Sequence, residues 1–82
     1  MDQAQAFEKV VKIITPFVKN ADALKSAGDG TKILEDLGVN SARLVDIILA
    51  FEDDFGIEID DATADGIRTI GDAVKMVVDK TK

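Results

Sequence analysis

Apolar residues recur every three or four positions in three separate stretches of this chain, which is the period of an amphipathic helix. The pattern is clearest near the C-terminus, where its members are Ile70, Ala73, Val74, Val77 and Val78. Thr69 and Asp72 have the spacing of a capping box, although aspartate is a weaker choice than glutamate at the second position. The pattern predicts a helix that follows Thr69 and buries this stripe.

The middle of the chain predicts a second helix. It should begin at Ser41, with Asn40 or Ser41 as its N-cap, and end at Gly56, because glycine is typical just past a helix. At about 100° per residue, one stripe of this helix should face the core. Its members are Leu44, Ile47, Ile48, Phe51 and Phe55.

The other face of this second helix mixes charge with apolar groups. Asp46, Glu52 and Asp53 point away from the apolar stripe, and Val45 and Leu49 lie among them. Apolar anchors in a polar surround are typical of a docking surface. The alternative is that two exposed aliphatic side chains have no function.

The start of the chain predicts a third helix, followed by a connector. Near the start, apolar residues at helical spacing are Phe7, Val10, Val11, Ile14 and Val18. Pro16 lacks a backbone donor and disfavours helical geometry at Thr15, so we expect a kink or an end near Thr15. Residues 19–32 have loop composition, and we expect a short turn at Ala23, Leu24 and Ala27.

Residues 57–60 alternate apolar and acidic side chains but have no partner strand, so we expect an extended connector there. Residues 61–66 fit one short helical turn. Together these elements predict an all-α fold. It is a small four-helix bundle with three longer helices and one short helix, formed by residues 1–82 as a single domain.

Composition removes most catalytic chemistries. The chain has no cysteine, so neither a disulfide nor a thiolate metal site is possible. It has no histidine, so the usual general base and the Ser-His-Asp triad are absent as well. The acidic clusters 52–54 and 60–61 lack EF-hand spacing, so we expect no dedicated metal site and at most weak cation binding.

No feature of the sequence indicates secretion or a membrane span. Asp2, Glu8 and two glutamines stand in the first ten residues, where a signal peptide would carry basic residues. The longest uninterrupted apolar stretch, 47–51, is far shorter than a membrane-spanning helix. We expect a cytoplasmic monomer.

One serine lies at a loop-to-helix corner. It ends the segment Glu35-Asp36-Leu37-Gly38-Val39-Asn40-Ser41. This segment resembles the attachment site of acyl carrier proteins, whose usual pattern there is Asp-Ser-Leu after a Leu-Gly pair. The resemblance is strong from Ile33 to Val78, and it continues through residues 44–55, 58–59 and 69–74.

The resemblance implies a carrier protein that is not an enzyme. In this family a phosphopantetheinyl transferase takes 4'-phosphopantetheine from coenzyme A and joins it to the serine, here Ser41, through a phosphodiester. The thiol of the arm then carries an acyl group as a thioester for partner enzymes. The residues agree with this role, since Ser41 has no histidine to activate it and Leu44 stands where a Ser-x-x-Lys pair would need lysine. A phosphate at a helix N-terminus also meets free N–H groups and the positive end of the helix dipole.

The net charge of −6 is unevenly distributed around this serine. Residues 35–65 contain ten acids and the single base Arg43, a net −9, whereas the rest of the chain sums to +3. Such a field repels nucleic acid and anionic membranes and steers basic proteins toward this half. Solubility alone is the alternative reason for the charge.

Two sets of site residues follow from these expectations. The first set is a candidate surface for partner enzymes that have basic surfaces, namely the transferase and the acyl-transfer or synthase enzymes. Its members are Asp36, Asn40, Ala42, Val45, Asp46, Leu49, Glu52 and Asp53. Candidates for lining an acyl site between the helices are Phe7, Val11, Ile14, Ile47, Phe51, Ile59 and Val74. A role as ordinary core is an equal alternative for the second set.

Three residues beside the serine depart from the family pattern. Asn40 replaces the usual aspartate, Ala42 replaces leucine, and Arg43 adds a positive charge. These changes leave open a housekeeping fatty-acid carrier and a carrier of a specialised acyl or polyketide-type product. A peptide-synthesis or amino-acyl carrier belongs to the same class. Two readings from other classes remain, an unmodified helical module that binds a basic partner and, least favoured, a small hydrolase. In the unmodified module Ser41 would serve only as a helix cap.

Overall fold

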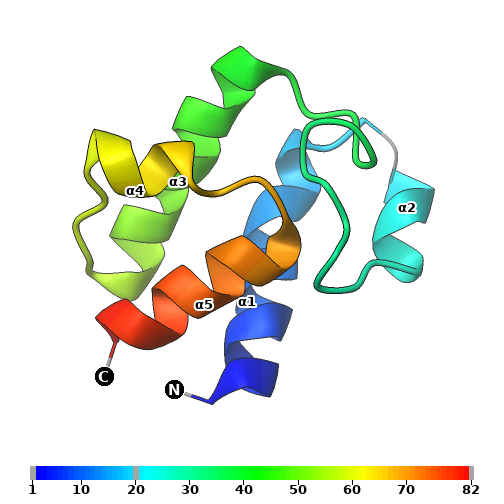
Figure 1. Cartoon of the computed structure of the whole chain (residues 1–82). Coiled ribbons are helices and arrows are strands. Elements are labelled where there is room, and N and C mark those ends of the chain that lie inside the picture. Colours follow the sequence, from blue (N-terminus) through cyan, green and yellow to red (C-terminus); the bar gives the residue numbers. More distant parts are fainter. Residues whose placement is uncertain (1, 20, 82) are drawn as a thin grey trace.

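The computed structural model describes residues 2–19 and 21–81, and in these ranges three long helices and two short ones build the fold. The elements in chain order are α1 (Gln3–Ile14), the 3₁₀ turn η1 (Thr15–Phe17), α2 (Ala21–Lys25), α3 (Ser41–Phe55), α4 (Asp61–Asp65) and α5 (Ile70–Lys80). Figure 1 shows α2 and α3 on opposite sides of α1, with α5 across it. Within the described ranges, one antiparallel bridge between Lys32 and Thr69 is the sole β contact, so the all-α prediction is confirmed.

Local sequence signals explain both ends of α1. Asp2 Oδ1 accepts a hydrogen bond from Gln5 N at 2.8 Å, and the Gln5 side chain accepts in return from Asp2 N, which makes a capping box. The helix ends at Ile14, and Pro16 occupies the first turn of η1. The predicted end near Thr15 is therefore confirmed.

The ends of α3 and α5 also follow the predictions. Gly56 has φ +64° and donates its N–H to the carbonyl of Glu52, which closes α3. Thr69 Oγ1 accepts from Asp72 N, and Asp72 Oδ2 accepts from Thr69 N, both at 3.1 Å. The capping box of α5 is thus present. Residues 57–60 form no strand, as predicted.

The core lies where α1 packs mainly on α5 and also on α3. Its buried members are Ala6, Val10, Ile14, Ile33, Leu37, Val39, Ile47, Phe51, Ile67, Ile70, Ala73, Val74, Met76 and Val77. Leu44 and Phe55 pack half-buried against it. The prediction is wrong for Ile48, which is half-buried and lines a surface groove with residues of α4. The reason is that α4, at five residues, is too short to cover this flank of α3.

The long first connector is more ordered than its composition predicted. Residues 21–25 form the helix α2 where only a turn was expected, so the bundle has two short helices, not one. Asp22 and Lys25 pair across one turn of it at 3.7 Å, and Leu24 packs half-buried against the core. Farther along, Ile33, Leu37 and Val39 are buried although they lie outside every helix.

Three backbone hydrogen bonds hold this connector against the start of α5. Gly71 N donates to Asp29 O at 2.8 Å, Ile70 N donates to Thr31 O at 3.0 Å, and Ile33 N donates to Arg68 O at 3.0 Å. We call this set the connector clasp. Only glycine fits at position 71, because a Cβ atom there would lie 2.8 Å from the carbonyl oxygen of Asp29.

Candidate functional site

Ser41 is the first residue of α3, and its side chain is exposed. Asn40 caps the helix, since its Oδ1 accepts from Ala42 N at 2.8 Å. The carbonyl of Asn40 accepts from Arg43 N at 2.9 Å and from Leu44 N at 3.1 Å. Of the two N-caps predicted, Asn40 is therefore the one used.

This cap changes what the helix N-terminus can offer an anion. The N–H groups of Ala42 and Arg43 are already occupied, so the predicted row of free donors is mostly used by Asn40. The N–H of Ser41 itself has no hydrogen-bond partner among the described residues. As the first N–H of α3 it lies at the positive end of the helix dipole, where it can meet a phosphate on the serine oxygen.

Five of the predicted docking residues share one exposed face of α3, which we call the docking face. At 3.6 residues per turn they fall within about 100° of the helix surface. They are Ala42, Val45, Asp46, Leu49 and Asp53. The aliphatic side chains stand well out of the core, with Val45 59% and Leu49 55% exposed. The face therefore offers two apolar anchors beside two carboxylates, Asp46 and Asp53.

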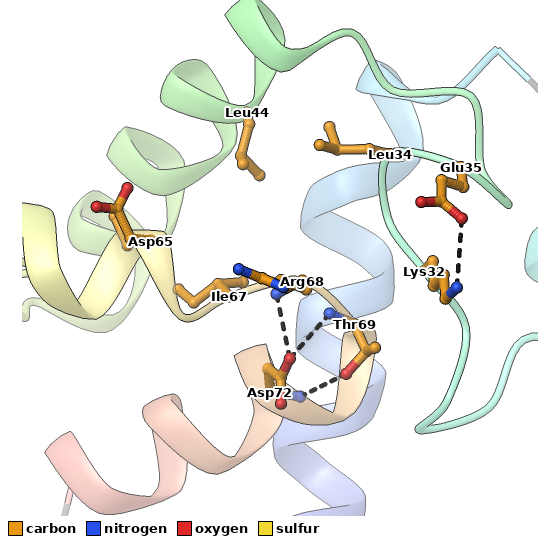
Figure 2. A pocket seen from close by; sticks show the side chains of 10 residues that line it. Lys32, Leu34, Glu35, Leu44, Asp65, Ile67, Arg68, Thr69 and Asp72 are labelled. Carbon is orange, nitrogen blue, oxygen red and sulfur yellow. Dashed lines mark hydrogen bonds and ion pairs between the residues drawn. The ribbon is translucent and has the colours of Figure 1, made fainter.

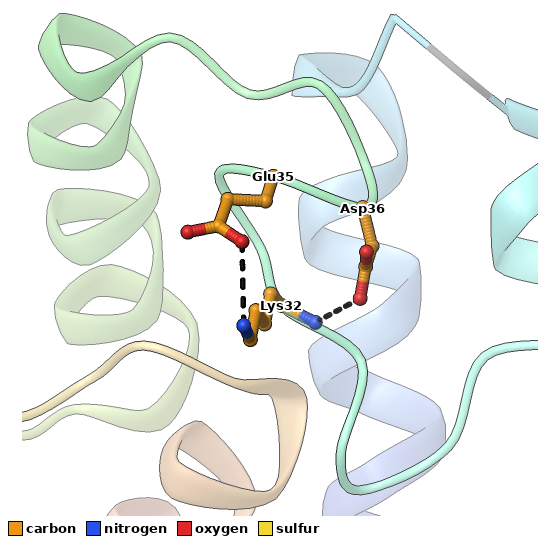
Figure 3. A network of polar contacts seen from close by, with 3 residues as sticks. All are labelled: Lys32, Glu35 and Asp36. Atoms are coloured by element: carbon orange, nitrogen blue, oxygen red, sulfur yellow. Dashed lines mark hydrogen bonds and ion pairs between the residues drawn. The ribbon is translucent and has the colours of Figure 1, made fainter.

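Two other predicted docking residues, Asp36 and Glu52, make hydrogen bonds within the protein. Asp36 Oδ2 accepts from Lys32 N at 2.9 Å, and the Lys32 ammonium lies 3.3 Å from Glu35 Oε2 (Figure 3). Glu52 is half-buried, and its Oε2 accepts from Ile59 N at 3.0 Å. Asp36 therefore organises the turn before α3, and Glu52 ties the connector after α3 to the helix.

A surface cavity of about 550 Å³ opens between the connector, α3, α4 and the start of α5. Leu34, Leu44 and Ile67 supply apolar lining (Figure 2). Charged side chains surround this lining, and they include Lys32, Glu35, Asp65, Arg68 and Asp72. The cavity thus combines an apolar floor with a polar rim.

A second, smaller groove of about 260 Å³ connects this cavity with the serine. It is lined by Ser41, Leu44, Val45, Ile48, Asp61, Ala64 and Asp65. Leu44, Ala64 and Asp65 line both spaces, so the groove and the cavity adjoin. We call the groove the serine groove. A group attached to Ser41 can follow it along α4 toward the cavity.

The residues predicted to line an acyl site lie elsewhere. Ile14, Ile47, Phe51 and Val74 are buried in the core, and half-buried positions packed against that core are held by Phe7, Val11 and Ile59. None of the seven lines the cavity or the serine groove. The lining that the sequence did not reveal includes Leu34 and Ile67, whose only signal was an apolar side chain within a connector.

Asp72, at the rim of the cavity, and Asp60, just before α4, accept hydrogen bonds from nearby donors. Backbone N–H groups of Arg68 and Thr69 lower the pKa of Asp72, and the hydroxyl and N–H of Thr63 lower the pKa of Asp60.

Among the described residues, no group of three or more acidic side chains is placed to hold a metal ion. The helices in those same ranges are also too short or too polar to cross a membrane.

Comparison of the sequence with known proteins indicates one kind of protein. Residues 20–77 match the family described as the phosphopantetheine attachment site. Two curated proteins are each 43% identical over 70 residues, which cover 85% of this chain and 87% of the relative. They are the acyl carrier protein of Sinorhizobium fredii (strain NBRC 101917 / NGR234) and acyl carrier protein AcpP of Rhizobium meliloti (strain 1021).

The fold is similar to a solved structure as well. The acyl carrier protein from Enterococcus faecalis superposes with a TM-score of 0.79 at 32% sequence identity. The match covers 98% of this chain and 99% of that chain. The similarity therefore includes the first connector and α2, which lie in the part where the sequence carries the fewest motifs.

Proposed function

This chain belongs to the acyl carrier proteins, and from that premise we propose that Ser41 carries its 4'-phosphopantetheine arm. The resemblance predicted from the sequence is confirmed, and so is the role as a carrier that is not an enzyme. The arm, when attached, supplies a thiol that holds acyl groups as thioesters. Such a carrier needs a residue that bears the arm, a surface that meets partner enzymes and a space that holds the acyl chain.

The position of Ser41 carries this proposal. Its side chain is exposed at the start of a 15-residue helix, and it lines a groove that adjoins an apolar cavity. Its N–H stays open for a phosphate oxygen. The chain has one other serine, Ser26, which lies outside the helices and lines neither the cavity nor the serine groove.

Attachment requires a base from outside this protein. The Ser41 oxygen must attack the phosphorus of coenzyme A that bears the pantetheine arm. The new P–O bond makes the serine phosphodiester, and the bridging P–O bond of the diphosphate breaks so that adenosine 3',5'-bisphosphate leaves. The serine proton must go to the transferase, because no histidine exists and no lysine lies three residues after Ser41. This residue inventory explains why the protein is a substrate of the transfer and not its catalyst.

We further propose that the acyl chain rests in the cavity beside α4. Leu34, Leu44 and Ile67 give it an apolar floor, and the serine groove joins it to Ser41. Ligand sites of this kind are mostly apolar and combine with a few polar groups at the rim. This proposal differs from the prediction made from the sequence, whose seven candidates lie in or against the core and line neither space.

The docking face suits partner enzymes with basic surfaces. Val45 and Leu49 provide anchors, while Asp46 and Asp53 provide charge. Charge of this kind increases the rate of encounter more than the final affinity. The expected partners are a phosphopantetheinyl transferase and the acyl-transfer or synthase enzymes that load and unload the arm.

Intact-mass spectrometry tests the attachment residue. The protein is incubated with coenzyme A, Mg²⁺ and a broad-specificity phosphopantetheinyl transferase. We expect a gain of one phosphopantetheine in the wild type and in Ser26→Ala, and no gain in Ser41→Ala. A gain that persists in Ser41→Ala, or no gain in any of the three proteins, would contradict the proposal. The second result would favour a carrier-like fold that binds partners without modification.

A further inference from the structure

Arg43 is the one basic residue in the acidic segment 35–65. Residues 35–65 contain ten acids and no other base. Arg43 lies two positions after Ser41, and its side chain is 64% exposed. Its Nη1 lies 3.6 Å from Asp46 Oδ2, and this ion pair is the contact that its guanidinium makes among the described residues.

Local structure gives Arg43 little reason to be there. A positive charge in the first turn of a helix opposes the positive end of the helix dipole. An exposed ion pair three residues apart, at a distance too long for a hydrogen bond, returns little stability. The first turn of α3 contains no acidic residue that would reverse this balance. The role of Arg43 therefore lies in something other than the stability of the fold.

Arg43 flanks the docking face and alters its charge. Three steps along the helix place Arg43 and Asp46 roughly 60° apart around its axis. The guanidinium pairs with one of the two carboxylates of that face, so it weakens the field that Asp46 offers a basic partner. It also presents planar N–H donors, a geometry that matches a carboxylate.

We infer that Arg43 selects partners for the docking face. It favours enzymes whose basic surface contains an acidic group opposite Arg43, and it slows enzymes whose surface is uniformly basic. This inference rests on the proposed attachment at Ser41, because it concerns the partners that approach that serine. Specificity of this kind works by placing a repulsive charge against the wrong partner.

The test compares the wild type with Arg43→Gln and Lys25→Gln as substrates of one broad-specificity transferase with a uniformly basic docking surface. Lys25 is a matched control, because it also forms an exposed i,i+3 ion pair and its loss changes the net charge equally. It belongs to α2, which Figure 1 shows on the opposite side of α1 from α3. The readouts are kcat and KM for phosphopantetheine transfer, each at low and moderate salt.

We expect Arg43→Gln to lower KM by about threefold or more at low salt, because rim charges mainly change association. The kcat should not change, and the gain should shrink as salt increases. Lys25→Gln should match the wild type. Equal KM values for Arg43→Gln and Lys25→Gln, with Ser41 modified normally, would overturn the inference and leave the proposed function intact. Absence of modification in every protein would contradict the attachment at Ser41 and the inference with it.

Discussion

At the scale of single residues, a substitution at Gly56 tests how much backbone conformation alone contributes to stability. It ends α3 with φ +64°, and a Cβ atom there would meet no heavy atom within 4 Å. Gly56→Ala should therefore lower the free energy of unfolding by about 1 kcal/mol, because L-residues disfavour the left-handed region. Urea unfolding followed by circular dichroism measures this difference.

Gly30→Ala is the matched control. Gly30 also has open space around a Cβ position, but its φ is not in the left-handed region. Alanine there should be neutral or stabilising by roughly 0.4–1 kcal/mol, since it restricts the unfolded chain. If both variants lost the same stability, conformation at Gly56 would not be the cause.

Residue roles could be predicted only where they depend on near neighbours. Asn40 and Ser41 were both acceptable caps by type, and the sequence left the choice open; hydrogen-bond geometry selects Asn40. Glu52 was predicted to meet partners, yet it binds the N–H of Ile59, seven residues later. From its position on the helix alone, a charged residue such as Glu52 is predicted to face solvent. The sequence of the helix does not show that the connector after it returns close enough to form a hydrogen bond with that residue.

At the scale of helices, the capping box of α5 predicts a pH effect. Backbone N–H groups of Arg68 and Thr69 bind the Asp72 carboxylate and hold its pKa below the ordinary value of 3.8. A carboxyl with a lowered folded pKa adds stability above its unfolded pKa and loses it as pH falls through the folded pKa. Asp72→Asn should thus be less stable than the wild type at pH 7, and the gap should close as pH falls below about 3.8.

Thermal unfolding of both proteins between pH 2 and 7 measures this gap. Asp60 titrates in both proteins, so its own lowered pKa cancels in the difference. Asp53→Asn is the control, because this exposed carboxylate has no hydrogen bond among the described residues and its loss should not destabilise the protein at pH 7. A gap for Asp72→Asn that stayed constant down to pH 2 would contradict the capping role.

Helices with strong periodicity and caps were predictable, and the connector between them was not. The segments at 41–55 and 70–80 combine an apolar stripe with a cap and a clear end, all of which are local signals. Ile33 and Leu37 are buried through contacts with distant elements, so no window of sequence around them reports it. The same limit applies to the cavity, whose apolar lining comes from the first connector (Leu34), α3 (Leu44) and the link between α4 and α5 (Ile67).

At the scale of the whole molecule, charge repulsion should limit stability. The ion pairs at 3.3–3.7 Å join exposed residues three apart, and such pairs offset little of the net −9 in residues 35–65. Raising NaCl from low to moderate concentration should therefore increase Tm, since salt screens exposed charges. A relief of about 1 kcal/mol corresponds to roughly 4–8 °C for a domain of this size.

Circular dichroism melts at several NaCl concentrations check this expectation. The double variant Asp53→Asn with Asp54→Asn removes two charges from the acidic half and should respond less to salt than the wild type. A wild-type Tm that did not change with salt would contradict the role of repulsion.

The connector clasp joins residues that are 35 to 42 positions apart, and it closes the chain between them into a loop with a fixed base. Ser41, the docking face and the apolar lining of the cavity all lie between Ile33 and Ile70. Recombination at the two sides of that base would therefore exchange attachment site, partner recognition and cargo space in one piece. The scaffold left by such an exchange is α1, α2 and most of α5, and the core residues of the exchanged span must still pack against α1 and α5.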